Sequence, residues 1–97
     1  MTTLNLQSKV KIGKDILCRE IEGEAVVLNS KTGVYYGLDP MGTRIWHLLE
    51  ESKTLDRICQ ALQLEFEVRE DRCQSDLLKF TGDLHKNRLV TLGSQSR

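Results

Sequence analysis

One stretch, residues 32–46, constrains the fold most, because it predicts a short aromatic strand that runs directly into a helix. It reads Thr-Gly-Val-Tyr-Tyr-Gly-Leu-Asp-Pro-Met-Gly-Thr-Arg-Ile-Trp. Asp39 is a good helix N-cap, and Pro40 suits the first helical position. The apolar segment 26–28 predicts a partner strand across a turn at 29–33. If the strand at 34–38 is the last of its sheet, its open edge is either a liability or a docking site.

Two further strands precede this stretch. Residues 16–21 and 24–29 are strand-like, and the Glu22-Gly23 pair between them predicts a β-hairpin. Together with 34–38 they predict a three-stranded antiparallel meander. Both faces of segment 25–28 are apolar, so the pattern leaves open which face of the sheet packs on the core.

Three amphipathic helices are predicted after the sheet, at about 40–51, 54–66 and 70–86, from apolar side chains at three- and four-residue spacing. We expect Thr54 to cap the second helix and Asn87 to end the third in the left-handed conformation. Gly42 is a poor helix former, which a close contact at that position would explain. Residues 89–92 predict either a short terminal strand or an apolar plug.

The 97 residues fit one α+β domain, in which a three-stranded antiparallel β-meander precedes three helices. The expected organisation is a flexible N-terminal segment at 1–14, a domain at 15–92 and a polar tail at 93–97. Val10 and Ile12 alternate with lysines, so a short strand is possible within the first segment.

Composition narrows the function classes. Lys plus Arg equal Asp plus Glu, 14 against 14, whereas binding to a nucleic acid backbone usually needs a positive field. The sequence has no apolar run of the roughly 18 residues that span a membrane, and no apolar signal-peptide core. A cytoplasmic protein with no nucleic acid and no membrane partner is expected.

Side chains that carry chemistry are few and scattered. His47 and His85 fall in different predicted helices without metal-ligand spacing, and the glycines form no phosphate-binding loop. The cysteines, Cys18, Cys59 and Cys73, are odd in number and lack a C-x-x-C motif. We interpret them as reduced structural thiols, with a redox pair or a metal site as the alternative. The sequence therefore predicts a non-enzyme with no catalytic residues, cofactor or metal.

Several segments in order resemble the PqqD family, over about residues 15–92. The resemblance is carried by Val27-Leu28-Asn29, Thr32 to Asp39, Gly42 to Leu49, Thr54-Leu55, Leu62 with Phe66-Glu67-Val68, and Asp76-Leu77, Phe80, Leu84 and Leu89-Val90. Asp39-Pro40 stands where the family often has Asn-Glu or Asn-Pro, and Asn87 stands where it usually has glycine. Both replacements keep a capping role.

The resemblance implies a winged-helix-like fold, a three-stranded meander followed by a three-helix bundle, and a role as a peptide chaperone. Such proteins are recognition elements for ribosomally synthesised precursor peptides. They hold the leader segment and present it to a modifying enzyme, which is a radical SAM protein in quinone-cofactor (PQQ) biosynthesis and a leader protease in lasso-peptide pathways. The leader adds as a strand to the third strand, beside the third helix.

On this chain the resemblance implies a peptide-binding site with two sides. The strand side comprises Gly33, Val34, Tyr35, Tyr36, Gly37 and Leu38, and the helix side comprises Arg69, Arg72, Cys73, Asp76, Leu77 and Phe80. Tyr35 and Tyr36 point to opposite faces, so one can pack inward while the other lines the groove. Leu77 and Phe80 can equally be core residues, and the charged residues a solvated helix face.

Two other functions remain open. The same edge can serve a non-catalytic adaptor or a homodimer, so the chain is expected as a monomer or a weak, strand-exchanged dimer. A winged-helix DNA binder fits the topology, but the third helix mixes Glu70, Asp71 and Asp76 with Arg69 and Arg72.

Overall fold

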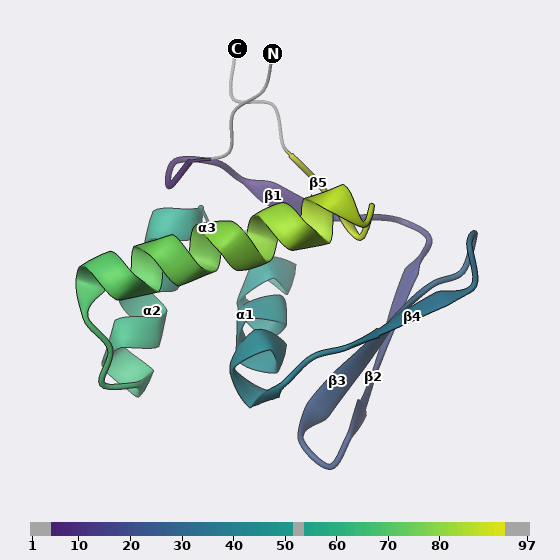
Figure 1. The fold of residues 1–97 in the computed structure, drawn as a ribbon, viewed down its shortest axis with the longest axis horizontal. Coiled ribbons are helices and arrows are strands. Elements are labelled where there is room, and N and C mark those ends of the chain that lie inside the picture. Colours follow the sequence, from purple (N-terminus) through teal and green to yellow (C-terminus); the bar gives the residue numbers. More distant parts are fainter. Residues whose placement is uncertain (1–4, 52–53, 93–97) are drawn as a thin grey trace.

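The computed structural model describes residues 5–51 and 54–92. Figure 1 shows the elements that occupy this part of the chain. They are β1 (Val10–Ile12), β2 (Ile16–Ile21), β3 (Glu24–Asn29), β4 (Val34–Gly37), α1 (Pro40–Glu50), α2 (Leu55–Glu65), α3 (Glu70–Lys86) and β5 (Val90–Leu92). The predicted order of three strands and three helices is confirmed, within one residue at most element ends. The polar tail expected at 93–97 lies outside the described residues.

The predicted meander is an antiparallel sheet of order β2-β3-β4, with β4 at one edge. Its hairpin turns at Glu22 and Gly23, which both have positive φ, 54° and 84°, as a tight hairpin turn requires. Gly33, with φ of 76°, serves the next turn in the same way. Local turn chemistry therefore sets the register of this sheet.

The structure resolves which face of the sheet packs on the helices. Ala25 and Val27 are fully buried, and Tyr36 lies opposite Val27 on the same face. The next residues along each strand point to the outer face of the sheet. On that face, Leu17 of β2, Leu28 of β3 and Tyr35 of β4 lie opposite one another in one row.

Helix α1 begins as predicted. The Asp39 carboxylate accepts a hydrogen bond from the Gly42 backbone N–H at 2.7 Å, and Pro40 holds the first helical position. The close contact expected at Gly42 is with the ring of Phe80 from α3. A Cβ at Gly42 would lie 3.2 Å from Phe80 Cε1, so the absence of a side chain lets α3 approach the start of α1.

The second helix is capped differently from the prediction. Thr54 occupies the N-cap position, but its hydroxyl donates to the Asp56 carboxylate and makes no cap bond to the backbone. The free N–H groups of Leu55 and Asp56 instead donate to the carbonyls of Ser8 and Leu6, at 3.2 and 2.8 Å. Thr54 therefore holds the predicted N-cap position, but backbone from the start of the chain makes the capping hydrogen bonds that its side chain does not.

The end of α3 also differs from the prediction. Asn87 has φ of −90° and is not left-handed, whereas the next residue, Arg88, has φ of 63°. The Arg88 N–H donates to the His85 carbonyl at 3.0 Å and the Leu89 N–H to the Leu84 carbonyl at 2.9 Å. An arginine therefore holds the conformation that glycine usually fills at a helix end.

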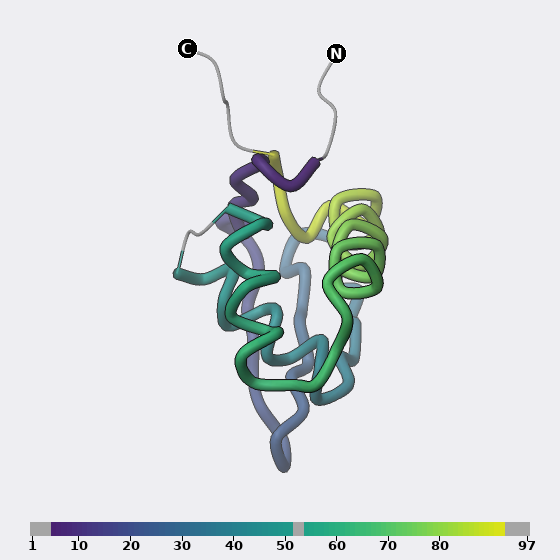
Figure 2. The backbone as a smooth tube through the Cα atoms, turned by 90° about the vertical axis from the view of Figure 1, so that its left-hand side faces the viewer, coloured from purple at the N-terminus to yellow at the C-terminus, as the bar shows by residue number. Residues whose placement is uncertain are grey.

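Strand β1 pairs antiparallel with β5, which joins two distant parts of the sequence. Val10 and Val90 are each 1% exposed. Figure 2 shows this ribbon at one end of the molecule and the β2–β3 turn at the opposite end. The packed part of the chain therefore reaches upstream of the boundary expected at residue 15. Over the described residues, no helix has the length and apolar character that a membrane crossing requires.

Candidate functional site

The free edge of β4 is the first part of the candidate site. The Leu38 N–H donates to the Ala25 carbonyl at 2.8 Å, and hydrogen-bonded pairs alternate along an antiparallel ladder. The backbone groups of Tyr35 and Gly37 therefore point away from β3, toward the open edge. Within the predicted strand side, residues 33–35 and 37 are exposed, whereas Leu38 is buried. The edge thus offers two outward N–H groups and two outward carbonyls.

The two tyrosines point to opposite faces. Tyr36 is half-buried on the helix face, and its hydroxyl donates to Asn87 Oδ1 at the end of α3, at 3.4 Å. Tyr35 is 67% exposed on the outer face. Tyr36 is therefore the tyrosine that lies between β4 and α3.

The helix side of the predicted site divides into two groups. Arg69, Arg72 and Asp76 are exposed, and Phe80 is half-buried. Cys73 and Leu77, at 5% and 1% exposure, belong to the core. These two lie on the stripe that packs α3 into the bundle, where Cys73 Sγ is 3.4 Å from Cys59 Sγ of α2. The structure therefore removes Cys73 and Leu77 from the accessible surface.

An adjacent stripe of α3 faces α1 and β4. Asp76, Phe80 and Asn87 follow one another at helical spacing, and the contacts of Phe80 with Gly42 and of Asn87 with Tyr36 fix its direction. In Figure 1, α3 and β4 approach at the C-terminal end of α3 and diverge toward its N-terminus. Sequence reasoning missed Asn87 as a site residue, although it lies on the same stripe as Asp76 and Phe80.

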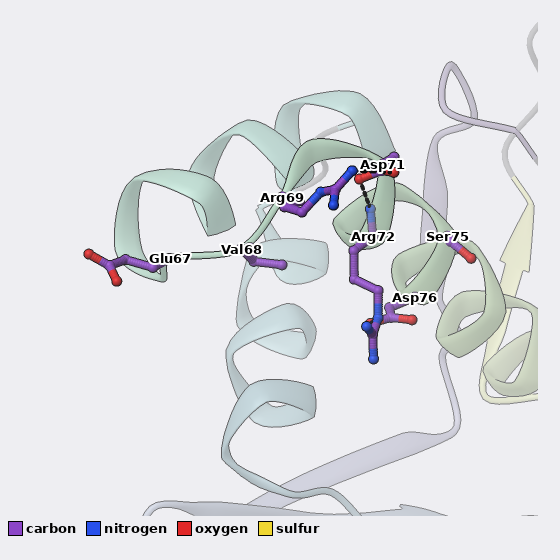
Figure 3. A pocket seen from close by; sticks show the side chains of 7 residues that line it. All are labelled: Glu67, Val68, Arg69, Asp71, Arg72, Ser75 and Asp76. Atoms are coloured by element: carbon purple, nitrogen blue, oxygen red, sulfur yellow. Dashed lines mark hydrogen bonds and ion pairs between the residues drawn. The ribbon is translucent and has the colours of Figure 1, made fainter.

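The first half of α3 carries an open cavity of about 640 Å³. It is lined by Glu67, Val68, Arg69, Asp71, Arg72, Ser75 and Asp76. Figure 3 shows Arg72 and Asp76 projecting from α3 alongside α1. Arg72 Nε lies 3.2 Å from Asp76 Oδ2, and both side chains are largely exposed. An exposed pair of this kind is worth little, so either charge is free to re-pair with a ligand.

The outer face of the sheet is an exposed apolar surface. Leu17, Ile21 and Tyr35 are 56, 62 and 67% exposed. Leu28 lies between Leu17 and Tyr35 in the same row. Exposed apolar side chains grouped on one face are a feature of interaction sites on small proteins.

Two other sets of titratable side chains lie between elements of the fold. His47 on α1 lies 2.6 Å from Glu20 of β2 and 3.3 Å from Glu50, which joins the helix to the sheet. Burial and the neighbouring Cys73 raise the pKa of Cys59 to about 12. In residues 5–51 and 54–92, no group of three or more His, Cys, Asp or Glu side chains is placed to hold a metal ion.

Comparisons with known proteins agree with this geometry. The family model described as coenzyme PQQ synthesis protein D (PqqD) matches residues 24–90. TbiB1, solved in complex with the TbiA(beta) leader peptide, is 36% identical, with a TM-score of 0.80 over 90% of this chain and 99% of that one. A lasso peptide synthetase B1, solved in complex with a leader peptide, shares the fold at 19% identity and a TM-score of 0.80, over 86% and 98% of the two chains. No curated protein matches. Because the family model covers more than half of the chain, from β3 through β4 and all three helices to the first residue of β5, the chain belongs to the PqqD family.

Proposed function

We propose that this protein captures the leader segment of a ribosomally synthesised precursor peptide by adding it as a strand to β4. The observation that carries the proposal is the open β4 edge, whose Tyr35 and Gly37 backbone groups point outward beside α3. The likeness to TbiB1, which was solved with a leader peptide bound, supports it. The role is recognition, with no catalytic step on this chain.

Backbone pairing alone is too weak for tight capture. Four hydrogen bonds to Tyr35 and Gly37 are worth a net of about 2–6 kcal/mol, whereas a micromolar complex needs about 8 kcal/mol. Side-chain contacts have to supply the rest of the binding free energy. Tyr36 and Phe80 offer apolar contact, and Arg72 and Asp76 offer charges for selectivity. Pockets for alternate side chains give specificity in strand addition.

We infer that the bound leader is presented to a modifying enzyme, either a radical SAM protein or a leader protease. A peptide strand on β4 leaves the outer face of the sheet uncovered, because it adds in the plane of the sheet. The row formed by the exposed Leu17 and Tyr35 with the half-buried Leu28 between them is therefore the surface on which the enzyme would dock. Ribosomal precursors are made in the cytoplasm, so we place the protein there.

Proline at position 35 tests strand addition. Of the backbone hydrogen-bonding groups, Tyr35→Pro removes only an outward N–H, so the β3–β4 ladder keeps its bonds, and edge strands tolerate proline. The matched control, Tyr35→Ala, removes the same ring and keeps the N–H. With a fluorescent TbiA(beta) leader, or the leader encoded beside this gene, we expect Tyr35→Pro to bind about tenfold more weakly than Tyr35→Ala, about 1.4 kcal/mol. Equal affinities of the two variants would refute capture at this edge.

The open edge also favours a second function, self-association through β4 of two copies. An unpaired edge accepts another chain as readily as a peptide. Sedimentation analysis of the oligomeric state, with and without leader, shows whether self-association and peptide capture use the same edge. A dimer that dissociates when leader is added indicates that both use β4, and a dimer that persists indicates a different interface.

A further inference from the structure

The two ends of the β4 edge carry opposite charge. A cavity of about 200 Å³ lies at the end where β4 begins, and Lys14, Lys31 and Arg88 line it with a single carboxylate, Asp15. Thr32, from the turn that leads into β4, also lines it. Three cations against one carboxylate leave a positive site at this end.

Arg88 stands at a position whose conformation usually favours glycine. Its φ of 63° costs a residue with a side chain about 1–2 kcal/mol, which glycine would avoid. Neither Lys14 nor Arg88 has an ion-pair partner in the described part of the chain. Asp15 is already 4.0 Å from Lys31. The Arg88 guanidinium is therefore exposed and free to pair with an anionic ligand.

The opposite end of β4 is acidic. A second cavity, of about 580 Å³, is lined by Gly37, Leu38 and Asp39, by Glu22 of the β2–β3 turn and by Glu24 at the start of β3. No lysine or arginine lines it. The two cavities therefore give the sheet a charge polarity that runs along β4.

We propose that this polarity selects a dipolar peptide, with acidic residues beside the Lys14–Lys31–Arg88 cavity and a basic residue beside Asp39. The proposal rests on capture of a peptide at β4 and names the class of peptide. Seven residues separate Thr32 from Asp39, about 24 Å at strand rise, so the acidic and basic residues of the peptide lie about seven apart. Reversing that order places like charges together at both ends.

A capped acidic tripeptide, acetyl-Asp-Asp-Asp-amide, tests the positive end without requiring strand addition. In amide NMR of the full chain at low salt, we expect it to shift Lys14, Lys31, Thr32 and Arg88, while acetyl-Asn-Asn-Asn-amide does not. The shifts disappear at about 0.5 M salt, where the screening length falls to a few ångströms. Equal shifts with both tripeptides overturn the proposal.

The variant Arg88→Gly separates strain from binding. We expect its Tm to rise by roughly 4–8 °C, because strain is released, while its affinity for the acidic tripeptide falls roughly two- to fivefold. Lys31→Gln gives the same loss of affinity without the gain in Tm. Arg57→Gln, an exposed cation on α2, changes neither. A higher Tm with unchanged affinity in Arg88→Gly overturns the proposal.

The two proposals fail separately. If the leader contacts Tyr35 and Gly37 but the acidic and asparagine tripeptides give equal shifts, peptide capture is supported and charge selection is refuted. If the acidic tripeptide binds but no leader protects the β4 edge from exchange, peptide capture is refuted.

Discussion

Replacing Thr43 with valine removes the hydroxyl that completes the sheet where β4 leaves it. Thr43 is buried on α1, and its Oγ1 accepts a hydrogen bond from the Ala25 N–H at 2.8 Å. The same hydroxyl faces the Leu38 carbonyl at 3.5 Å. The Thr43 side chain therefore contributes to the junction between sheet and helix that sets the position of the β4 edge, together with the backbone bond from Leu38 to Ala25.

The cost of Thr43→Val follows from burial. Valine has the same shape, so packing is kept, but the fully buried Ala25 N–H loses its partner. Leaving such a donor unpaired costs about 1–3 kcal/mol. A domain of this size loses about 4–8 °C of Tm per kcal/mol, so we expect Tm to fall by about 5–20 °C.

The control is Thr43→Ser, which keeps the hydroxyl and loses one methyl group, worth about 0.8 kcal/mol. Urea unfolding followed by circular dichroism gives the free energy of unfolding of each variant. We expect the order wild type, Thr43→Ser, Thr43→Val, from most to least stable. A valine variant at least as stable as the serine variant would refute the role assigned to this hydrogen bond.

Two further predictions concern titratable groups. Arg44 lowers the pKa of Glu65 below its ordinary value of 4.5 through hydrogen bonds at 2.6 and 2.7 Å, so this pair stabilises the fold above that value and stops doing so as pH falls through the lowered pKa. Urea unfolding at several pH values should therefore show wild type more stable than Glu65→Gln near pH 6, with the gap closing below pH 4; a gap that stays constant with pH contradicts this. Burial raises the pKa of Cys59 to about 12, and Cys59 and Cys73 are both in the core. In native alkylation followed by mass spectrometry, half-buried Cys18 should react first; labelling of Cys59 as fast as Cys18 argues against the packed α2–α3 interface.

Features that depend on local chemistry were predictable from the sequence. Asp39 and Pro40 start α1 as expected, because capping involves only neighbouring residues. The Glu22-Gly23 turn set the hairpin for the same reason. The strand that forms the β4 edge was found where its β-branched and aromatic residues, Val34 to Tyr36, place it.

Features that depend on distant parts of the chain were not. The pairing of β1 with β5 and the capping of α2 by the Leu6 and Ser8 carbonyls join segments that no local pattern connects. The sheet face was ambiguous because both faces of β3 are apolar. Cys73 and Leu77 were assigned to the site because a helical stripe does not reveal which neighbour it meets; here it meets the core.

Hydrogen exchange at the four amides of residues 35–38 tests the central claim most directly. Without peptide, we expect Tyr35 and Gly37 to exchange rapidly, because their N–H groups point to the open edge, while Tyr36 and Leu38 are protected by β3. Addition of saturating leader should slow exchange at Tyr35 and Gly37 and leave Tyr36 and Leu38 little changed. Protection that spreads evenly over all four amides, or that leaves Tyr35 and Gly37 fast while the leader is bound, would contradict strand addition at β4.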